Sequence, residues 1–339
     1  MTTELNLTEA AMCMEQLILA NVPVYVEGAP GVGKSEVIDQ VAGKINYKVI
    51  EYRASIREPV DLRGVPVPDL KAGVTRWLAP DELPREDRDG KFGILKLDEI
   101  NTASLSMQAA CFGLVLERRI GDYHLPAGWV PVAAGNRLKD KAAAQRMPTA
   151  LANRFAILAV KADTTTWASW ATKNDVHPYV IAFLRFRPNL IHIMPTSDDQ
   201  KAFPTPRSWV ALSKVLKRLD VGSAVVRPIS EALVGTAATM EFSAFLSIVK
   251  DMPTIDDIVD DPIKARVPAE SNVAQLYALA TGLARMATRA NIESIAAYVK
   301  RMPREFEVLS MTDAIRNENL STTKALTQWA VANSRSLTI

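Results

Sequence analysis

A stretch of eight residues near the start of the chain, GAPGVGKS at positions 28–35, has the composition and spacing of a phosphate-binding loop. Its glycines let the backbone curl so that N–H groups point inward at phosphate oxygens, while Lys34 supplies a positive charge and the Ser35 hydroxyl is placed to bind Mg2+. An apolar run at 22–26 precedes the loop and a helical pattern at 36–44 follows it, which disfavours a glycine-rich turn without a ligand. The candidate nucleotide-binding residues are therefore Gly28, Ala29, Pro30, Gly31, Val32, Gly33, Lys34 and Ser35.

A pair of carboxylates, Asp98 and Glu99, follows an apolar run at 93–97. An aspartate at the end of such a strand is suited to hold Mg2+, and the adjacent glutamate is suited to orient or deprotonate an attacking water. Asp-Glu pairs are common on surfaces, but the position after a strand and downstream of the loop favours the chemical role. Lys96 interrupts the apolar run, and we expect its side chain to face a helix end or solvent.

Asn136 closes another apolar run, at 129–134. Its amide is suited to hydrogen-bond the outermost phosphate or the attacking water. The alternative is an ordinary turn, because Gly-Asn is frequent where strands end. The two preceding motifs favour the functional interpretation.

Three arginines are candidates for contacts with phosphate charge. Arg154, at the end of a helical stretch, is suited to reach a neighbouring subunit's nucleotide as an arginine finger, or else to relieve the dipole of its own helix. Arg137 is a weaker candidate. Arg207 opens a helix in the second half of the chain, where it either contacts phosphate or is an ordinary first-turn residue.

Short apolar runs alternate with helical patterns through the first half of the chain. The expected strands lie at 22–26, 48–52, 93–97, 129–134 and 156–160, and the first helix is expected to be capped by Thr8. This alternation predicts a parallel sheet with helices on both faces and a ligand site at the carboxyl ends of the strands. The runs at 65–70 and 74–78 predict a β-hairpin, and a second is expected within 117–125.

The second half of the chain has helical patterns almost throughout. Helices are expected at 206–219, 230–249, 272–289, 292–301 and 321–333, with a boundary in the Asp- and Pro-rich loop 251–268. The apolar segment 229–249 contains Glu231 and Glu241, which favours a buried or amphipathic helix over a membrane span.

Composition limits the classes of protein to which the chain could belong. The 339 residues suggest two or three domains, and 40 basic against 38 acidic side chains do not imply a nucleic-acid partner. Cys13 and Cys111 are expected to be buried reduced thiols, and His124, His177 and His192 have no metal-ligand spacing. Because the first residues lack a basic segment, we expect no secretory signal and a cytoplasmic protein.

Together these motifs resemble the AAA+ ATPases and, within them, the MoxR-type group, whose relatives include CbbQ, NorQ, the magnesium chelatase subunit and the MCM helicases. The matching segments are GAPGVGKS (28–35), EPVDLRG (58–64), TRWLAPDEL (75–83), LKLDEIN (95–101), LERRIGDYHLP (116–126), AAGN (133–136) with LANRF (151–155), and TPRSW (205–209). The EPVDLRG segment and its hairpin point to the MoxR type. The resemblance covers about residues 5–250.

The resemblance implies an α/β fold: an AAA+ P-loop NTPase core at 1–160 with β-hairpin insertions, an all-α lid at 161–250 and a helical C-terminal extension at 251–339. It implies ATP and Mg2+ as cofactors, with Ser35 and Asp98 at the metal and Glu99 as the catalytic base. Asn136 would be sensor 1, Arg154 the arginine finger and Arg207 sensor 2. The usual Asn-Pro after sensor 1 is replaced by Asn136-Arg137, so Arg137 is also expected to sense phosphate.

By the same resemblance, the protein would form a homo-oligomer, a hexameric ring with the hairpins at its pore. It would act as a chaperone that remodels or activates a protein client, often with a von Willebrand A-domain adaptor. A nucleic-acid motor of the same clade is the rival hypothesis, because Arg63, Lys71, Arg76, Arg118 and Arg119 could follow a phosphate backbone and Trp77 and Tyr123 could stack on bases. Nearby acidic residues oppose it. A switch that does not hydrolyse ATP is disfavoured because every hydrolytic residue type is present.

Overall fold

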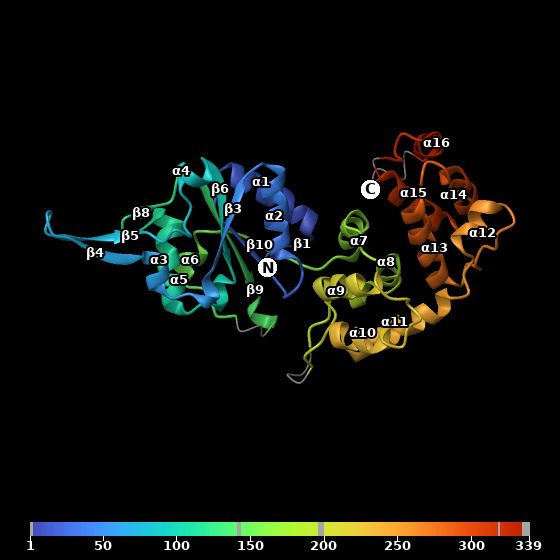
Figure 1. Cartoon of the computed structure of the whole chain (residues 1–339), viewed down its shortest axis with the longest axis horizontal. Helices are drawn as coiled ribbons and strands as arrows, with labels where there is room; N and C mark the ends of the chain where they lie inside the picture. The colour runs from blue at the N-terminus through green and yellow to red at the C-terminus, as the bar shows by residue number, and fades with distance from the viewer. Residues whose placement is uncertain (1–2, 141–143, 196–199, 318, 334–339) are drawn as a thin grey trace. The chain divides into compact units, whose positions relative to one another are not determined.

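The computed structural model describes residues 3–140, 144–195, 200–317 and 319–333, and the end of the expected C-terminal extension, residues 334–339, lies outside these ranges. The chain forms two compact units, Met1–Ala162 and Asp163–Ile339. Each unit is described by itself below, with elements labelled as in Figure 1.

A parallel sheet of six strands forms the centre of the first unit, as expected for an α/β fold. In spatial order the strands are β1 (Glu4–Leu5), β10 (Ala156–Val160), β2 (Val24–Gly28), β9 (Gly128–Asn136), β6 (Phe92–Asp98) and β3 (Lys48–Arg53). All five expected strands are present, with ends shifted by up to two residues. The edge strand β1 was not expected, because two residues are too short to show a pattern.

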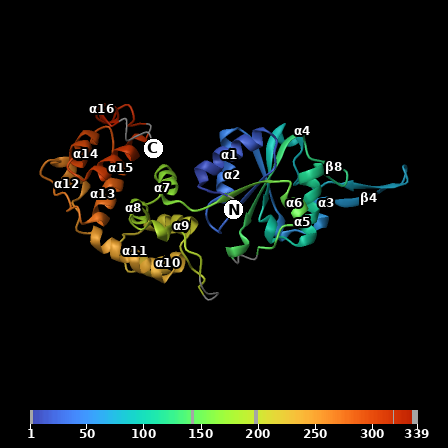
Figure 2. The same cartoon turned by 180° about the vertical axis from the view of Figure 1, so that it is seen from behind.

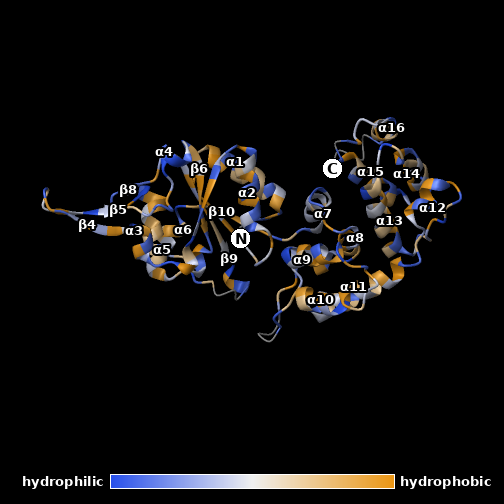
Figure 3. Ribbon diagram, viewed as in Figure 1, coloured by the Kyte–Doolittle hydropathy of each residue, from blue (hydrophilic) through white to orange (hydrophobic). Residues whose placement is uncertain are grey.

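Helices cover both faces of this sheet (Figure 2). On one face lie α1 (Leu7–Leu19) and α2 (Lys34–Lys44). The other face carries a buried apolar cluster that joins the sheet to α3 (Pro59–Arg63), α5 (Leu105–Phe112) and α6 (Thr149–Ala152). The hydropathy colouring in Figure 3 shows the central strands as strongly apolar, which is typical of parallel strands buried on both faces.

Helix α1 begins earlier than the sequence pattern suggested. Asn6, rather than Thr8, caps it in a capping box: the Asn6 side chain accepts a hydrogen bond from the Glu9 backbone N–H, and the Glu9 carboxylate accepts one from the Asn6 backbone N–H. The buried stripe of α1 is Ala10, Met14 and Ile18. Cys13 lies off this stripe and is exposed, so the expectation that it is buried was wrong, whereas Cys111 is buried.

Two β-hairpins extend the first unit, as expected. The first hairpin pairs β4 (Val65–Asp69) with β5 (Val74–Leu78) and projects away from the body of the unit (Figure 1). The second hairpin pairs β7 (Arg119–Ile120) with β8 (Tyr123–His124).

Lys96 on β6 does not face solvent, which corrects the sequence-based expectation. Its side chain is 5% exposed, and its ammonium lies 2.9 Å from Asp39 Oδ1 on α2 and 2.8 Å from Glu51 Oε2 on β3. The buried charge is therefore balanced by two carboxylates, which is the usual condition for keeping a lysine inside a protein. The contact ties α2 to two neighbouring strands of the sheet.

The second unit is helical throughout its described residues. Its α-helices are α7 (Thr164–Lys173), α8 (Pro178–Phe186), α9 (Pro206–Leu216), α10 (Val226–Val234), α11 (Thr236–Val249), α12 (Ile255–Asp260), α13 (Val273–Met286), α14 (Ile292–Val299), α15 (Arg304–Ile315) and α16 (Lys324–Ala332). A cluster of aromatic rings, among them Phe183, Trp209, Phe242 and Phe245, packs α8, α9 and α11 together.

Three sequence-based expectations for the second unit were wrong. The helix expected at 230–249 is broken at Gly235, whose φ of +81° and close approach to the Ala202 carbonyl leave no room for a side chain. The expected loop 251–268 contains α12, capped by Thr254 and Asp257. Helix α15 was not expected; its weak amphipathic pattern reflects burial of polar side chains such as Glu307 and Asp313.

Helices on both sides of residue 250 share buried contacts. The Arg185 guanidinium on α8 lies 2.7 Å from Asp313 Oδ2 on α15, and both side chains are almost fully buried. Arg185 also donates a hydrogen bond to Thr281 on α13. The division of the helical part into a lid and an extension at residue 250 stays a prediction.

None of the described helices combines the length and the apolar character needed to cross a membrane.

We expect Lys96→Met to lower the free energy of unfolding at pH 7 by about 1–3 kcal/mol, because it leaves the Asp39 and Glu51 carboxylates without their cation. The hydrogen bond from Lys96 lowers the pKa of Glu51 below its ordinary value of 4.5. A depressed carboxyl pKa stabilises the fold above the unfolded-state pKa and loses that effect as pH falls through the folded-state value. The difference between wild type and variant should therefore shrink as pH drops below 4.5.

Denaturant unfolding at several pH values measures this difference. Lys44→Met is the matched control, because Lys44 pairs with Glu15 at the surface and is 65% exposed; its effect should stay within about 0.5 kcal/mol. A Lys96→Met difference that is independent of pH would contradict the assignment to the ion pair.

Candidate functional site

The phosphate-binding loop leaves β2 at Gly28 and enters α2 at Lys34. Gly33 caps α2 with a φ of +104°, a conformation that residues with a side chain rarely adopt. At Gly28 an added Cβ would lie 2.6 Å from a methyl carbon of Val160 on the adjacent strand. Both positions therefore require glycine for steric reasons, and the loop directs the amino end of α2 toward the carboxyl edge of the sheet.

The Lys34 ammonium lies at the centre of this edge. It donates hydrogen bonds to the carbonyl oxygens of Gly28 and Ala29, each at 3.0 Å, and to Asn136 Oδ1 at 2.9 Å. Asn136 comes from β9, which pairs with β2 so that Asn136 stands opposite Gly28. The structure thus brings together two residues that are 102 positions apart in the chain. Both can exchange these partners for phosphate oxygens, which accept stronger hydrogen bonds from an ammonium.

Ser35 and Asp98 lie together beside the lysine. The Ser35 hydroxyl donates to Asp98 Oδ2 at 3.1 Å, which places two hard oxygen donors side by side. Magnesium is commonly held by one or two protein oxygens together with substrate phosphates and water, so this pair suits Mg2+. The described residues contain no cluster of three or more His, Cys, Asp or Glu that could hold a metal by itself.

Glu99 is the next residue along the chain, and its backbone is in the left-handed region with a φ of +54°. Its carboxylate accepts a hydrogen bond of 2.7 Å from the hydroxyl of Ser55, in the short helical turn Ala54–Ile56 after β3. Left-handed backbone is uncommon outside glycine and costs about 1 kcal/mol or more, so neighbouring contacts must maintain it. Sequence analysis did not single out Ser55, because a lone serine after a strand carries no motif.

Asn101 is a second residue that sequence analysis did not assign, although it lies within the LKLDEIN segment. It is 3% exposed. Its amide donates to the Asn136 carbonyl at 2.5 Å and accepts from the Asn136 backbone N–H at 3.1 Å. An added Cβ at Gly135 would lie 2.4 Å from the Asn101 side-chain oxygen, so this close fit needs glycine at 135. Asn101 therefore fixes the backbone that carries the Asn136 side chain.

The Arg137 side chain is engaged in ion pairs with two carboxylates. Its guanidinium pairs with Asp140 at 2.8 Å and with Glu4 at 3.1 Å, and the Asp140 contact raises its pKa. This arrangement links the edge strand β1 to the segment that follows Asn136. A part for Arg137 in sensing phosphate stays a prediction.

Arg154 follows the short helix α6 and precedes β10. It is exposed, and its side chain makes no hydrogen bond or ion pair with any of the described residues. Helix α6 has only four residues, so its dipole is small and gives Arg154 little to relieve. Among the described residues, therefore, none explains this cation as a partner.

Arg207 and His177 lie in the second unit, outside the segments that carry the other site residues. Arg207 is an exposed residue in the first turn of α9, in the second unit, and its proposed role stays a prediction. The His177 ring accepts a hydrogen bond from the Tyr179 backbone and caps α8, and burial lowers the pKa of His177 to about 4.

Comparison with protein families identifies the nucleotide-site segment. Residues 23–155 match the family model of the AAA domain, dynein-related subfamily. The matched stretch runs from the residue before β2 to the residue before β10, and it contains every assigned site residue except Arg207. This segment is thus similar to AAA domains, and the expected α/β fold of an AAA+ core, a parallel sheet between helices, is confirmed.

Several solved structures show a distant likeness. NtrX from Brucella abortus in complex with ADP is 14% identical at a TM-score of 0.44, covering 99% of this chain and 70% of that one. The Holliday junction branch migration motor RuvB of Thermotoga maritima is 15% identical at a TM-score of 0.40, covering 80% of both chains. Because both scores and identities are low, neither likeness carries a conclusion about this chain.

We expect Ser55→Ala to reduce the rate of ATP hydrolysis about tenfold, because the Glu99 carboxylate loses the hydrogen bond that orients it. ATP affinity should be unchanged, since the Ser55 hydroxyl donates its hydrogen bond to Glu99, which is expected to act on water and not on the nucleotide. Steady-state kinetics with a nucleotide titration separates the two effects.

Ser55→Thr is the matched control, because threonine keeps the hydroxyl and should restore most of the activity. If Ser55→Ala hydrolyses ATP faster than wild type, Ser55 restrains Glu99 instead of presenting it, and the assignment is wrong.

Proposed function

We propose that this chain binds ATP with Mg2+ at the phosphate-binding loop and hydrolyses it. The observation that supports this proposal is that direct hydrogen bonds join Lys34 to Asn136 and Ser35 to Asp98, which bring together one helix and the ends of two strands. A cation, an amide, a hydroxyl and a carboxylate at one edge form the donor and acceptor set that phosphoryl transfer requires. The match of residues 23–155 to AAA domains supports the same activity.

Each residue has a distinct part in this proposal. Lys34 and the loop N–H groups bind the outer phosphates, and Asn136 orients the terminal phosphate or the water. Ser35 and Asp98 would hold Mg2+, which neutralises phosphate charge when it is bound. Glu99 accepts the proton of the attacking water, and Ser55 keeps its carboxylate in one direction.

Arg154 is proposed to complete the site of an adjacent copy of the chain. It is exposed, and it lies within a domain whose other site residues are already held by internal contacts. A cation without a partner among the residues that the structure describes is available to neutralise transition-state charge in a neighbouring subunit. A closed ring, hexameric in the MoxR-type group that the chain resembles, gives every subunit such a neighbour.

We further propose that ATP hydrolysis serves to remodel, activate or assemble a partner protein complex, as in MoxR-type chaperones, with a protein client or a von Willebrand A-domain adaptor. The EPVDLRG segment at 58–64 and the projecting first hairpin support this assignment. The exposed apolar side chains of that hairpin, including Leu70 at 89% exposure, suit a protein surface.

A nucleic-acid motor is the less favoured alternative, because several of the side chains that suggested it are engaged within the chain. Arg118 donates to the carbonyl oxygens of Pro126, Ala127 and Trp129, and burial lowers its pKa. Tyr123 is buried and is unavailable for stacking on a base. Arg76 and Arg119 form surface ion pairs with neighbouring acidic residues. Such exposed pairs are weak, so they reduce the attraction of these arginines for phosphates only modestly. DNA-stimulated ATPase activity with a steep salt dependence would reverse this preference.

We expect Glu99→Gln to bind ATP with wild-type affinity but to lose about 10²–10⁴-fold in hydrolysis rate, because glutamine cannot accept the proton of water. The measurement is phosphate release under saturating Mg2+ and ATP, together with nucleotide binding in the same samples. Glu82→Gln, which removes an exposed carboxylate paired with Arg57, is the matched control and should retain full activity. Wild-type hydrolysis by Glu99→Gln would exclude Glu99 as the base.

We expect Arg154→Ala to bind ATP normally and to lose about 10³-fold or more in turnover, as arginine fingers do. Mixing this variant with Lys34→Ala in equal amounts should restore activity, because about a quarter of the sites then combine an intact loop with a neighbour's arginine. Arg227→Ala, at an exposed arginine of the second unit, is the control. If the mixture stays inactive while each variant still assembles, Arg154 does not act across subunits.

A further inference from the structure

The second hairpin touches the first at the point where the first hairpin leaves the body of the unit. The Trp77 backbone N–H on β5 donates a hydrogen bond of 2.8 Å to Asp122 Oδ2, in the turn of the second hairpin. Within the first hairpin Trp77 stands opposite Pro66, which cannot donate to the facing strand. In an antiparallel pair that exchanges no hydrogen bonds, the backbone N–H of each residue points away from the facing strand. The first hairpin therefore relies on a side chain from outside itself to satisfy a backbone donor of β5.

A second contact joins the same two segments. The Tyr123 hydroxyl donates a hydrogen bond of 2.7 Å to the carbonyl of Pro84, seven residues downstream of Trp77. Tyr123 is buried, and burial raises its pKa, which keeps the hydroxyl protonated as a donor. Two adjacent side chains thus hold this part of the chain: Asp122 binds β5 itself, and Tyr123 binds the segment that follows it.

Packing reinforces these hydrogen bonds. The Arg63 guanidinium lies 4.0 Å from the centre of the Trp77 ring, a distance typical of a cation–π contact. Gly121, with a φ of +55°, lies against the same pair: an added Cβ would be 3.6 Å from atoms of both Arg63 and Trp77. The turn of the second hairpin therefore fits closely against the base of the first.

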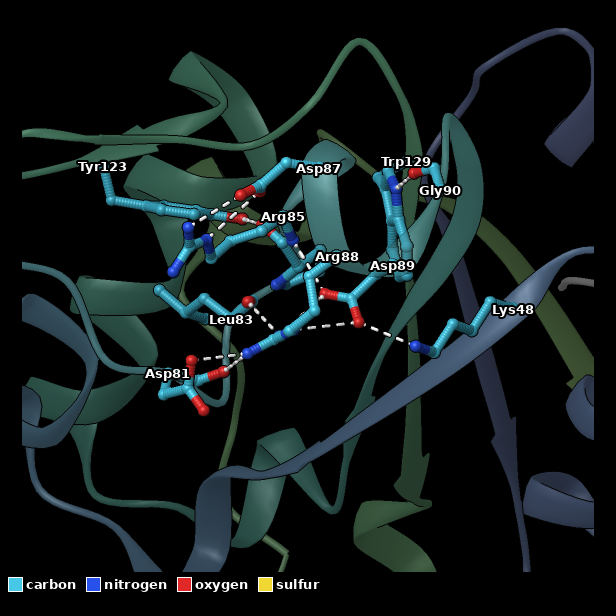
Figure 4. Close-up of polar contacts among 11 residues, drawn as sticks. Lys48, Asp81, Leu83, Arg85, Asp87, Arg88, Asp89, Gly90, Tyr123 and Trp129 are labelled. Carbon is cyan, nitrogen blue, oxygen red and sulfur yellow. Dashed lines mark hydrogen bonds and ion pairs between the residues drawn. The ribbon is translucent and has the colours of Figure 1, made fainter.

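Both segments are anchored independently on the sheet. The second hairpin is fixed at its base by Arg118, whose guanidinium binds carbonyl oxygens at the start of β9. Beyond the first hairpin, the Asp89 carboxylate binds Arg88 and Lys48, as Figure 4 shows, and Arg88 lowers the pKa of Asp89. The chain that follows the first hairpin is therefore attached to β3 through Lys48.

The second hairpin is also continuous with the carboxylate edge of the candidate site. From Glu99 the chain runs through the turn Ile100–Thr102, helix α5 and the π-helical segment Gly113–Glu117 into β7. Helix α5 packs in the buried cluster through Met107 and Cys111. A packed helix rather than a loose loop therefore connects the segment next to Glu99 to the second hairpin.

We propose that Asp122 and Tyr123 are positioning residues: they set the direction in which the first hairpin projects and make it move together with α5. The joint movement of the first hairpin and α5 rests on the proposed nucleotide binding. The attachment of the first hairpin through Asp122 and Tyr123 does not. The second hairpin would thus connect the proposed nucleotide site to the projecting first hairpin.

The attachment is tested on the full-length protein without nucleotide, by amide hydrogen exchange with single-residue resolution at Trp77. In Asp122→Ala the Trp77 amide should exchange about tenfold faster or more, because it loses an acceptor that carries a charge. Asp122→Asn keeps an oxygen acceptor and should restore most of the protection. Tyr123→Phe should speed exchange across 79–84 without disturbing the hydrophobic cluster.

Asp69→Ala is the matched control, because Asp69 pairs with Arg76 and binds Ala72 within the first hairpin only. This variant should speed amide exchange at the turn of the first hairpin and leave the Trp77 amide protected from exchange. Unchanged exchange at Trp77 in Asp122→Ala would overturn the proposed attachment.

The movement is tested by adding Mg2+ and a non-hydrolysable ATP analogue to the same proteins. In wild type the exchange of residues 65–78 should change by about threefold or more on binding, and in Asp122→Ala this response should disappear while analogue affinity stays within about twofold. Binding without any response in wild type, or an intact response in Asp122→Ala, would overturn the coupling. Absence of analogue binding would instead contradict the proposed function, and the Trp77 result would still decide the attachment.

Discussion

The candidate site depends on the register between β2 and β9. In this register Gly28 stands opposite Asn136, and the next strand, β6, ends beside them at Asp98. Because side chains alternate between the faces of a sheet, a shift by one residue would turn Asn136 away from Lys34 and separate the groups that face phosphate. Both faces of β9 are buried, so such a shift would exchange the side chains of two packed layers and lose their fit against the neighbouring helices.

Small residues and internal amides convert this register into a defined geometry. Gly28 and Gly135 allow neighbouring groups to approach to distances at which no side chain would fit. Asn101 then uses that space to bind both backbone groups of Asn136. A buried polar side chain with its hydrogen bonds satisfied is costly to displace, so Asn136 is held before any ligand arrives. Preorganisation of this kind is what electrostatic catalysis requires.

The two hairpins are held by other kinds of contact than the central sheet. The sheet is packed mainly through buried apolar side chains, whereas the hairpins and their attachments are held by paired charges, hydrogen-bonded backbone donors and one cation–π contact. Such contacts are directional and individually modest, so they fix orientation more than they add stability. The first hairpin, with its exposed apolar side chains, therefore stands on a well-defined base although it buries little surface itself.

The amino-acid sequence by itself determined the phosphate-binding loop, the five main strands and both hairpins. Each depends on local signals: glycines at fixed spacing, apolar runs of strand length, and turn residues between them. The sequence also indicated Asp98, Glu99 and Asn136, because a polar residue directly after an apolar strand of a parallel sheet lies at its functional edge.

Only the tertiary structure revealed how Ser55, Asn101 and Asp122 act. Each makes its decisive contact with a residue that is 35 to 45 positions away, and an isolated Ser, Asn or Asp has no local signature. The same limit explains the errors at Lys96 and Gly235: whether a lysine is buried with carboxylates, or a glycine approaches a distant carbonyl, depends on segments brought together by folding. Local patterns specify elements, but the partners of buried polar groups are decided by long-range packing.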